Sequence, residues 1–325
     1  MHHALARAVR AAVTLSVLAY AGAAGAQAWP AKGVRFVVPF AAGGPADLFA
    51  RVLAQRLQDA VGQPFIVDDR PGAGSIIGTE IVAKSPPDGY TLLMMSNTHT
   101  VNESLVPKKP FTLMKDFVPI APVNYSDLLL VVHPSVPAKN VKELIALAKA
   151  KPHGLNYASS GTGTPYHMAG ELFKSMAGVD IVHVPHKGSS EARTSVVSGQ
   201  VEVMIDAITT MAPQVQSGQL KALGATGLKR SEVLPDVPTV DEAGVPGYEA
   251  VIWLGLMAPA GTPKPIVDKL NAEINKVLSR PDVQEAWAKQ GAVPMKMTPA
   301  QFDKYLRDDI DKWAKVVKIS GAQVQ

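Results

Sequence analysis

Hydrophobic and polar positions follow two alternating patterns along the chain from Val34 onward. Short apolar runs rich in β-branched or aromatic residues predict strands, and the segments between them, including 141–151, carry helical periodicity. The runs expected to form strands are 34–39, 65–69, 90–96, 128–132, 155–159, 181–184, 201–206, 220–225 and 252–257. Strands that alternate with helices through short loops are typical of an α/β fold.

The helix expected behind Asp47 is amphipathic, and Gly62 stands where its C-terminal cap belongs. The residues expected on its buried face are Leu48, Phe49, Val52, Leu53 and Val61.

The order of the elements predicts two lobes. The strand at 252–257 is followed by helices that have no new strands to cover, and the first block of strands offers them a sheet. We therefore expect the chain to leave the first lobe near residue 124 and to return near 250. Lobe 1 would hold residues 29–124 and 251–325, lobe 2 would hold 125–250, and a ligand cleft would lie between them.

The first 28 residues have the features of a secretory signal peptide. Arg7 and Arg10 precede an apolar stretch that runs from Ala11 to about Ala24. Small residues then allow cleavage after Ala26 or after Ala28. This segment predicts export to the periplasm.

Composition excludes several classes of function. The chain has no cysteine, so thiolate metal sites, disulfides and cysteine nucleophiles are ruled out. Its formal charge of +4 comes without the basic block that nucleic acid binding requires. His183 and His186 are three residues apart but lack acidic companions, so we expect no metal, and no motif indicates a cofactor.

Two loops between a strand and a helix carry the chemistry expected of an anion site. In the segment 39–47, Gly43 and Gly44 allow a ligand to approach the main chain, and the helix behind them offers unpaired amide groups. A tight turn capped by Asp47 is the alternative. The loop at 157–167 adds the hydroxyl groups of Ser159, Ser160, Thr162 and Thr164. Across a cleft, the two loops would suit a dicarboxylate.

Two further strand ends are candidates. The cluster 96–99 contains Thr98, and Asp206 ends the strand at 201–206. Asp206 either meets a ligand ammonium or hydroxyl or caps the helix after it. If Asp206 faced the ligand, an amino-acid ligand would be favoured, because its ammonium group needs a counter-charge.

Enzymatic motifs are missing from the sequence. It contains no Gly-x-Ser-x-Gly elbow, no phosphate-loop Gly-Lys pair and no His-Glu-x-x-His. A hydrolase would have to pair Ser159 or Ser160 with His167. A ligand sensor for a signalling partner is a second alternative, because its cleft would be the same.

Eight segments together resemble one known family. They are VRFVVPFAAGGPAD, DDRPGAGS, PPDGYTLLM, DFVPIAPV, LNYASSGTGTPYHMAGELF, VHVPHKGSS, LPDVPTVDEAGVPGYE and WLGLMAPAGTPKPIVDKLN. In this order they resemble the Bug family, the periplasmic receptors of tripartite tricarboxylate transporters, over essentially the whole mature chain. The resemblance implies a type II periplasmic-binding-protein fold, a non-enzymatic monomer that closes on a small carboxylate (a dicarboxylate, tricarboxylate, aromatic acid or amino acid), and delivery to membrane permease subunits.

The resemblance also implies a set of ligand-binding residues. They are Phe40, Gly43, Gly44, Ala46, Asp47, Thr98, Ser159, Thr162, Gly163, Thr164 and Asp206. The chain departs from the family pattern at two places. Pro45 and Ala46 stand where the family usually has a Thr or Ser before the aspartate, and His186 replaces a usual Tyr.

Overall fold

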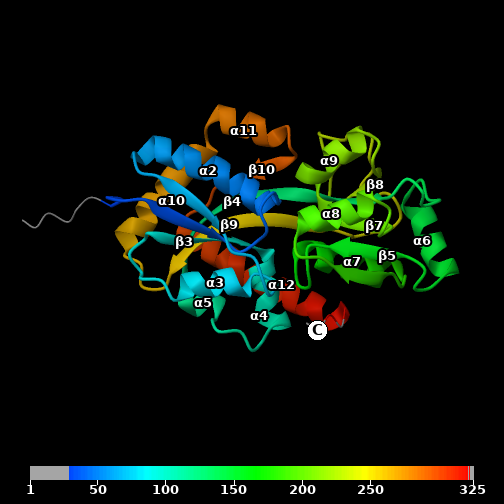
Figure 1. Cartoon of the computed structure of the whole chain (residues 1–325), viewed down its shortest axis with the longest axis horizontal. Helices are drawn as coiled ribbons and strands as arrows, with labels where there is room; N and C mark the ends of the chain where they lie inside the picture. The colour runs from blue at the N-terminus through cyan, green and yellow to red at the C-terminus, as the bar shows by residue number, and fades with distance from the viewer. Residues whose placement is uncertain (1–28, 321, 323–325) are drawn as a thin grey trace, which may run out of the picture.

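The computed structural model describes residues 29–320 and 322 (Figure 1). The predicted signal peptide, residues 1–28, lies outside the described residues. Two long strands, β4 (Phe117–Val132) and β9 (Val251–Pro259), run through the middle of the molecule and connect two groups of strands and helices (Figure 1).

The strands form one ten-stranded sheet with the order β2-β1-β3-β9-β4-β7-β5-β6, and β8 and β10 also pair with β4. Pairing is parallel within β2-β1-β3 and within β7-β5-β6, and antiparallel wherever β4 or β9 takes part. The remaining strands are β1 (Val34–Val38), β2 (Phe65–Asp69), β3 (Thr91–Ser96), β5 (Asn156–Ser159), β6 (Val182–Pro185), β7 (Val203–Ala207), β8 (Lys221–Ala225) and β10 (Ala292–Pro294).

Helices cover both faces of each group of strands. The helices are α2 (Pro45–Val61), α3 (Ile76–Ala83), α4 (Asn97–Leu105), α5 (Leu113–Asp116), α6 (Val141–Ala150), α7 (Pro165–Ala177), α8 (Ser189–Val197), α9 (Ile208–Gln216), α10 (Lys264–Leu278), α11 (Pro281–Ala288) and α12 (Pro299–Ser320). In the first group, one core lies under α2, α10 and α11, and another lies under α3, α5 and α12. In the second, α6 and α7 cover one core and α8 and α9 the other.

The strand β4 is three times as long as the pattern predicts, because only 128–132 were expected to be extended. Pro119 and Pro122 interrupt the apolar run, and the pairing with β9 shifts register next to each of them. Proline lacks an amide donor and is tolerated in a sheet mainly at such irregularities. The first part of β4 pairs with β9, and the last five residues pair with β7 and β8. The lobe boundaries near 124 and 250 stay predictions.

The helix α2 differs from expectation in its buried face. Leu48 and Val52 are 43% and 39% exposed, whereas Phe49, Leu53 and Leu57 are buried. The observed stripe follows a strict four-residue spacing, which lets the helix lie along the sheet. Gly62 does end the helix, in a left-handed conformation. Within the described residues, no helix is long and apolar enough to cross a membrane.

Candidate ligand-binding site

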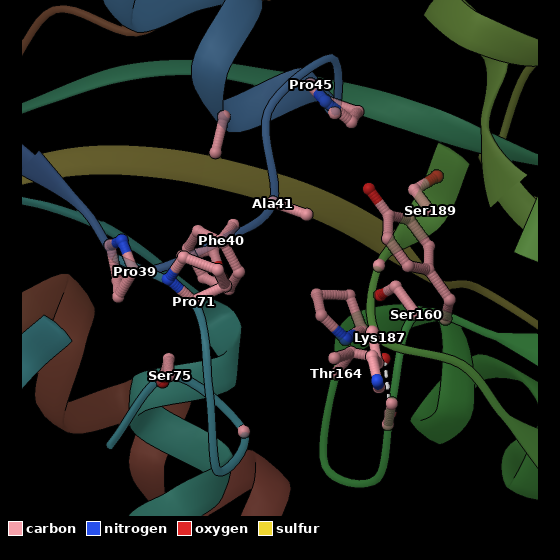
Figure 2. A pocket seen from close by; sticks show the side chains of 18 of the residues that line it. Pro39, Phe40, Ala41, Pro45, Pro71, Ser75, Ser160, Thr164, Lys187 and Ser189 are labelled. Atoms are coloured by element: carbon pink, nitrogen blue, oxygen red, sulfur yellow. Dashed lines mark hydrogen bonds between the residues drawn. The ribbon is translucent and has the colours of Figure 1, made fainter. Parts of the chain in front are cut away.

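A cavity of about 500 Å³ lies between the two groups of strands and helices. The first group lines it with residues from the segments 39–46 and 71–75 and with Ser96. The second group contributes residues from 160–166 and 186–189 (Figure 2). Strand β9, which the two groups share, adds two apolar side chains, Ile252 and Leu254.

Five helices begin at this cavity. The residues that precede their first turns are Gly44 of α2, Ser75 of α3, Ser96 of α4, Thr164 of α7 and Gly188 of α8, and all five line the cavity. The first turn of a helix has amide groups without intrahelical partners and carries a partial positive charge. Their convergence makes the cavity an electropositive environment that favours anions.

The side chains that line the cavity reinforce this preference. Among the described residues that line it, Lys187 is a permanent cation and none is an aspartate or glutamate. Much of the remaining wall is apolar, with Phe40, Pro71 and Tyr166 among its larger side chains. An anion with a hydrophobic body fits these surroundings better than a cation or a zwitterion.

The first predicted loop contributes part of its residues. Phe40, Gly44 and Ala46 line the cavity, whereas Gly43 and Asp47 do not. The carboxylate of Asp47 is buried and accepts the Gly43 amide at 2.8 Å, and its other oxygen lies 2.6 Å from Arg51 Nε. Gly43 has a φ of 75°, a conformation that glycine adopts without strain. Asp47 therefore holds the shape of the loop from inside.

The second predicted loop also contributes only part of its residues. Thr164 lines the cavity together with Ser160 and Gly161, but Ser159, Thr162 and Gly163 do not. The Ser159 side chain is buried, and its Oγ lies 2.6 Å from His183 Nε2.

Ser159 thus pairs with His183 and not with His167, the histidine that a hydrolase would need. The His183 ring is stacked on Tyr157 and on His167, with centroid distances of 4.9 and 4.1 Å. Burial lowers the pKa of His183 to about 3 and that of His167 to about 4, so both rings are neutral near pH 7. His167 Nδ1 accepts the Gly163 amide at 3.1 Å. Ser159 and the two histidines stabilise the loop behind the cavity wall.

Neither of the two remaining candidates reaches the cavity. Thr98 is fully buried, and its hydroxyl lies 3.1 Å from that of Ser96. Asp206 is also fully buried, and it accepts the Ala207 amide at 2.6 Å and the hydroxyl groups of Ser189 and Tyr166. Burial raises the pKa of Asp206 to about 6. Asp206 neither caps α9, whose N-cap is Ala207, nor presents a charge to the cavity.

Sequence reasoning missed several residues that line the cavity. They include Ser75, Lys187, Gly188 and Ser189, together with the apolar side chains of β9. The sequence pattern that could have identified some of them was present, because the runs RPGAGS and HKGSS also place small residues between a strand and a helix.

The two walls touch each other on both sides of the cavity. A Cβ atom added to Gly188 would lie 2.6 Å from the Cβ of Ala41. On the other side, a Cβ atom added to Gly74 would lie 3.3 Å from the Thr162 carbonyl oxygen. The two walls are therefore close enough at both places to leave no room for an added methyl group without a shift.

The sequence model of the TctC family, the tripartite tricarboxylate transporter family receptors, matches residues 49–322 of the chain. The chain belongs to this receptor family. Protein BugT of Bordetella pertussis (strain Tohama I) is 39% identical over 302 residues, which cover 92% of this chain and 93% of that protein.

Solved structures of other receptors share the fold. Rpa4515 of R. palustris, solved with adipate, is 36% identical with a TM-score of 0.88 over 91% of this chain and 100% of that one. MatC of Rhodopseudomonas palustris, solved with bound malate, is 34% identical with a TM-score of 0.84 over 89% of this chain and 100% of that one. The expected α/β periplasmic-binding-protein fold is confirmed, and the receptor belongs to a family of solute-binding proteins and not of enzymes.

Proposed function

We propose that this receptor captures a small carboxylate in the periplasm and delivers it to the membrane permease of a tripartite tricarboxylate-type transporter. The observation that carries the proposal is the convergence of five helix N-termini on a cavity whose described lining holds Lys187 and no carboxylate. Such an environment stabilises a negative charge through oriented amide groups. Relatives solved with adipate and with malate support the same class of ligand.

The predicted residues divide into two roles in this proposal. Phe40, Gly44, Ala46 and Thr164 contact the ligand, since they line the cavity. Gly43, Asp47, Ser159, Thr162 and Gly163 shape the two loops, and Thr98 and Asp206 support residues of the wall from behind. A free amino acid is a poor ligand, because its ammonium group would meet helix N-termini and Lys187 without a counter-charge.

Thermal-shift and calorimetric titrations of the purified protein test the proposal. We expect several carboxylic acids to raise the melting temperature, since a ligand that binds only the folded state stabilises it. Their neutral amides serve as matched controls and should not bind. Equal binding of acid and amide, or the absence of any shift across a panel of dicarboxylates, tricarboxylates and aromatic acids, would contradict carboxylate capture.

Delivery needs a separate experiment in cells. Uptake of the acid that binds should fall when the gene for this receptor is deleted, and the full chain with its leader should restore it. A chain without residues 1–28 should not restore uptake, because the proposed route depends on export. Normal uptake in the deletion strain would contradict the transport role.

A further inference from the structure

The two walls of the cavity differ in character. Pro39, Phe40 and Pro71 stand on one side, and Ser160, Thr164, Lys187 and Ser189 stand on the other (Figure 2). A ligand that spans the cavity therefore meets a largely apolar surface on one side and polar groups on the other.

One hydroxyl on the apolar side has no hydrogen-bond partner within the part of the chain that the structure describes. Ser75 is 3% exposed, and its Oγ is a buried atom without a hydrogen-bond partner among the described residues. Ser75 precedes α3, lines the cavity and has a φ of 78°, an unfavourable conformation for any residue other than glycine. A buried hydroxyl without a partner is costly. Its position at a helix N-terminus suits a ligand carboxylate, which would accept hydrogen bonds from this hydroxyl and from the nearby amide groups.

One charge on the polar side also lacks an ion-pair partner among the described residues. Lys187 is exposed at the cavity, and among residues 29–320 no carboxylate forms an ion pair with its ammonium group. Its backbone amide is held by Glu191 at 3.0 Å, which fixes the place of Lys187 ahead of α8. A second carboxylate of the ligand would find its counter-ion here.

Between these two ends most side-chain hydroxyl groups of the described lining are already engaged, and Ser160 is the exception (Figure 2). The hydroxyl groups of Ser189 and Tyr166 donate to Asp206, and that of Thr164 donates to Gly161 O at 2.7 Å. Ile252 adds an apolar side chain from β9. A ligand body with several hydroxyl groups would lose its water here, and Ser160 alone would not replace those hydrogen bonds.

We propose that the ligand is a dicarboxylic acid with an apolar body, either an alkyl chain or an aromatic ring, and without hydroxyl or amino substituents. One carboxylate accepts a hydrogen bond from the hydroxyl of Ser75, and the other forms an ion pair with Lys187. This inference rests on the proposed function and narrows it to one chemical class.

Calorimetric titration with matched acids tests the class. Adipate should bind at least tenfold more tightly than hexanoate, which lacks the second carboxylate, and terephthalate should likewise exceed benzoate. Mucate has the carbon chain of adipate with four hydroxyl groups, and we expect it to bind on the order of 100-fold more weakly. Mucate binding as tightly as adipate would overturn the apolar body while leaving carboxylate capture intact.

Two variants test the assignment of the ends. Lys187→Met should weaken the better-binding diacid about tenfold and leave its matched monoacid unchanged. Ser75→Gly removes the hydroxyl and relieves the positive φ, so the protein should fold at least as well while the diacid binds several-fold more weakly. Lys149→Met, an exposed lysine on α6, is the control for loss of charge.

The outcomes separate the two proposals. If Lys187→Met weakens the binding of monoacid and diacid equally, or of neither, Lys187 does not bind a second carboxylate. The inference then fails, although the receptor still binds acids. If Ser75→Gly leaves the affinity unchanged, the first carboxylate lies elsewhere. If no acid binds at all, the proposed function fails as well.

Discussion

His99 Nε2 lies 3.0 Å from Thr79 Oγ1, and this contact joins the first turns of two helices at the cavity. The Thr79 hydroxyl donates to Ser75 O at 2.7 Å, so His99 acts as the donor to Thr79 through Nε2. Its Nδ1 accepts the Ser96 amide at 3.2 Å. One neutral imidazole thereby fixes the positions of Ser75 and Ser96, which both line the cavity.

The first prediction concerns acid sensitivity. Burial lowers the pKa of His99 to about 4, against 6.5 in the unfolded chain. A depressed histidine pKa means that the unfolded state binds the proton more readily, so this contribution to stability is complete above pH 6.5 and falls as pH drops towards 4. The slope is at most about 1.4 kcal/mol per pH unit. Between pH 7 and pH 5, protonation of His99 in the unfolded state should therefore lower the unfolding free energy of the wild-type protein by about 2 kcal/mol.

The measurement compares urea unfolding of the wild type and His99→Gln at both pH values. The difference in unfolding free energy between them should shrink by about 2 kcal/mol at pH 5. The comparison is needed because other groups also titrate here. Burial lowers the pKa of His167 and His183 and raises the pKa of Asp206 to about 6. A difference that stays constant with pH would show that His99 does not charge on unfolding.

The second prediction concerns the contact between the walls. Gly188 has an extended backbone, with a φ of 170° that any residue can adopt, so Gly188→Ala should fold normally. Its new Cβ would lie 2.6 Å from the Cβ of Ala41, far inside the usual carbon contact distance of about 3.5 to 4 Å. The walls would have to move apart, and we expect ligand affinity to fall at least tenfold.

A compensating variant makes this prediction specific. Ala41→Gly in the same chain removes the atom that Gly188→Ala would meet, so the double variant should regain most of the affinity. Calorimetry with the acid that binds best measures all three proteins. Wild-type affinity in Gly188→Ala, or no recovery in the double variant, would argue against closure through this contact.

The third prediction separates neighbouring serines. Ser159→Ala removes the buried hydrogen bond to His183 and should lower the unfolding free energy by about 1 kcal/mol or more, with affinity changed less than about twofold. Ser160→Ala removes a hydroxyl from the cavity wall and should weaken binding about fivefold with little effect on stability. Chemical denaturation and calorimetry on both variants test the pair, and a reversed pattern would place Ser159 at the ligand.

The fourth prediction addresses selectivity at Ala46, the position beside Asp47 at which the family resemblance implies a hydroxyl-bearing residue. Ala46 lines the cavity and is 5% exposed. Ala46→Ser would supply a partner for a ligand hydroxyl, so the preference for adipate over mucate should narrow about fivefold. Leu48→Ser, on the exposed side of the same helix, is the control and should leave the ratio unchanged. An equal change in both variants would mean that Ala46 does not select the ligand.

Local patterns predicted much of the fold. Each run from Val34 to the strand at 252–257 that was expected to be extended overlaps a strand, with ends that differ by up to two residues except in the longer β4, because β-branched alternation depends on nearby residues alone. The first part of β4 could not be recognised, since its prolines are tolerated only through irregular pairing with β9, more than 120 residues away in the sequence. The short strand β10 was missed for the same reason: its pairing with β4 gives it its extended form.

The sequence by itself determined that small, hydroxyl-bearing loops stand between strands and helices, and that the chain resembles carboxylate receptors. Only the tertiary structure decided which side chains in those loops face the cavity. Asp47 is held by its own loop and Arg51, Ser159 by His183, and Asp206 by Ser189 and Tyr166. Buried polar groups must find partners, and the packing of distant segments sets which partners are within reach. Lys187, left without such a partner among the described residues, is therefore the charge that remains for a ligand.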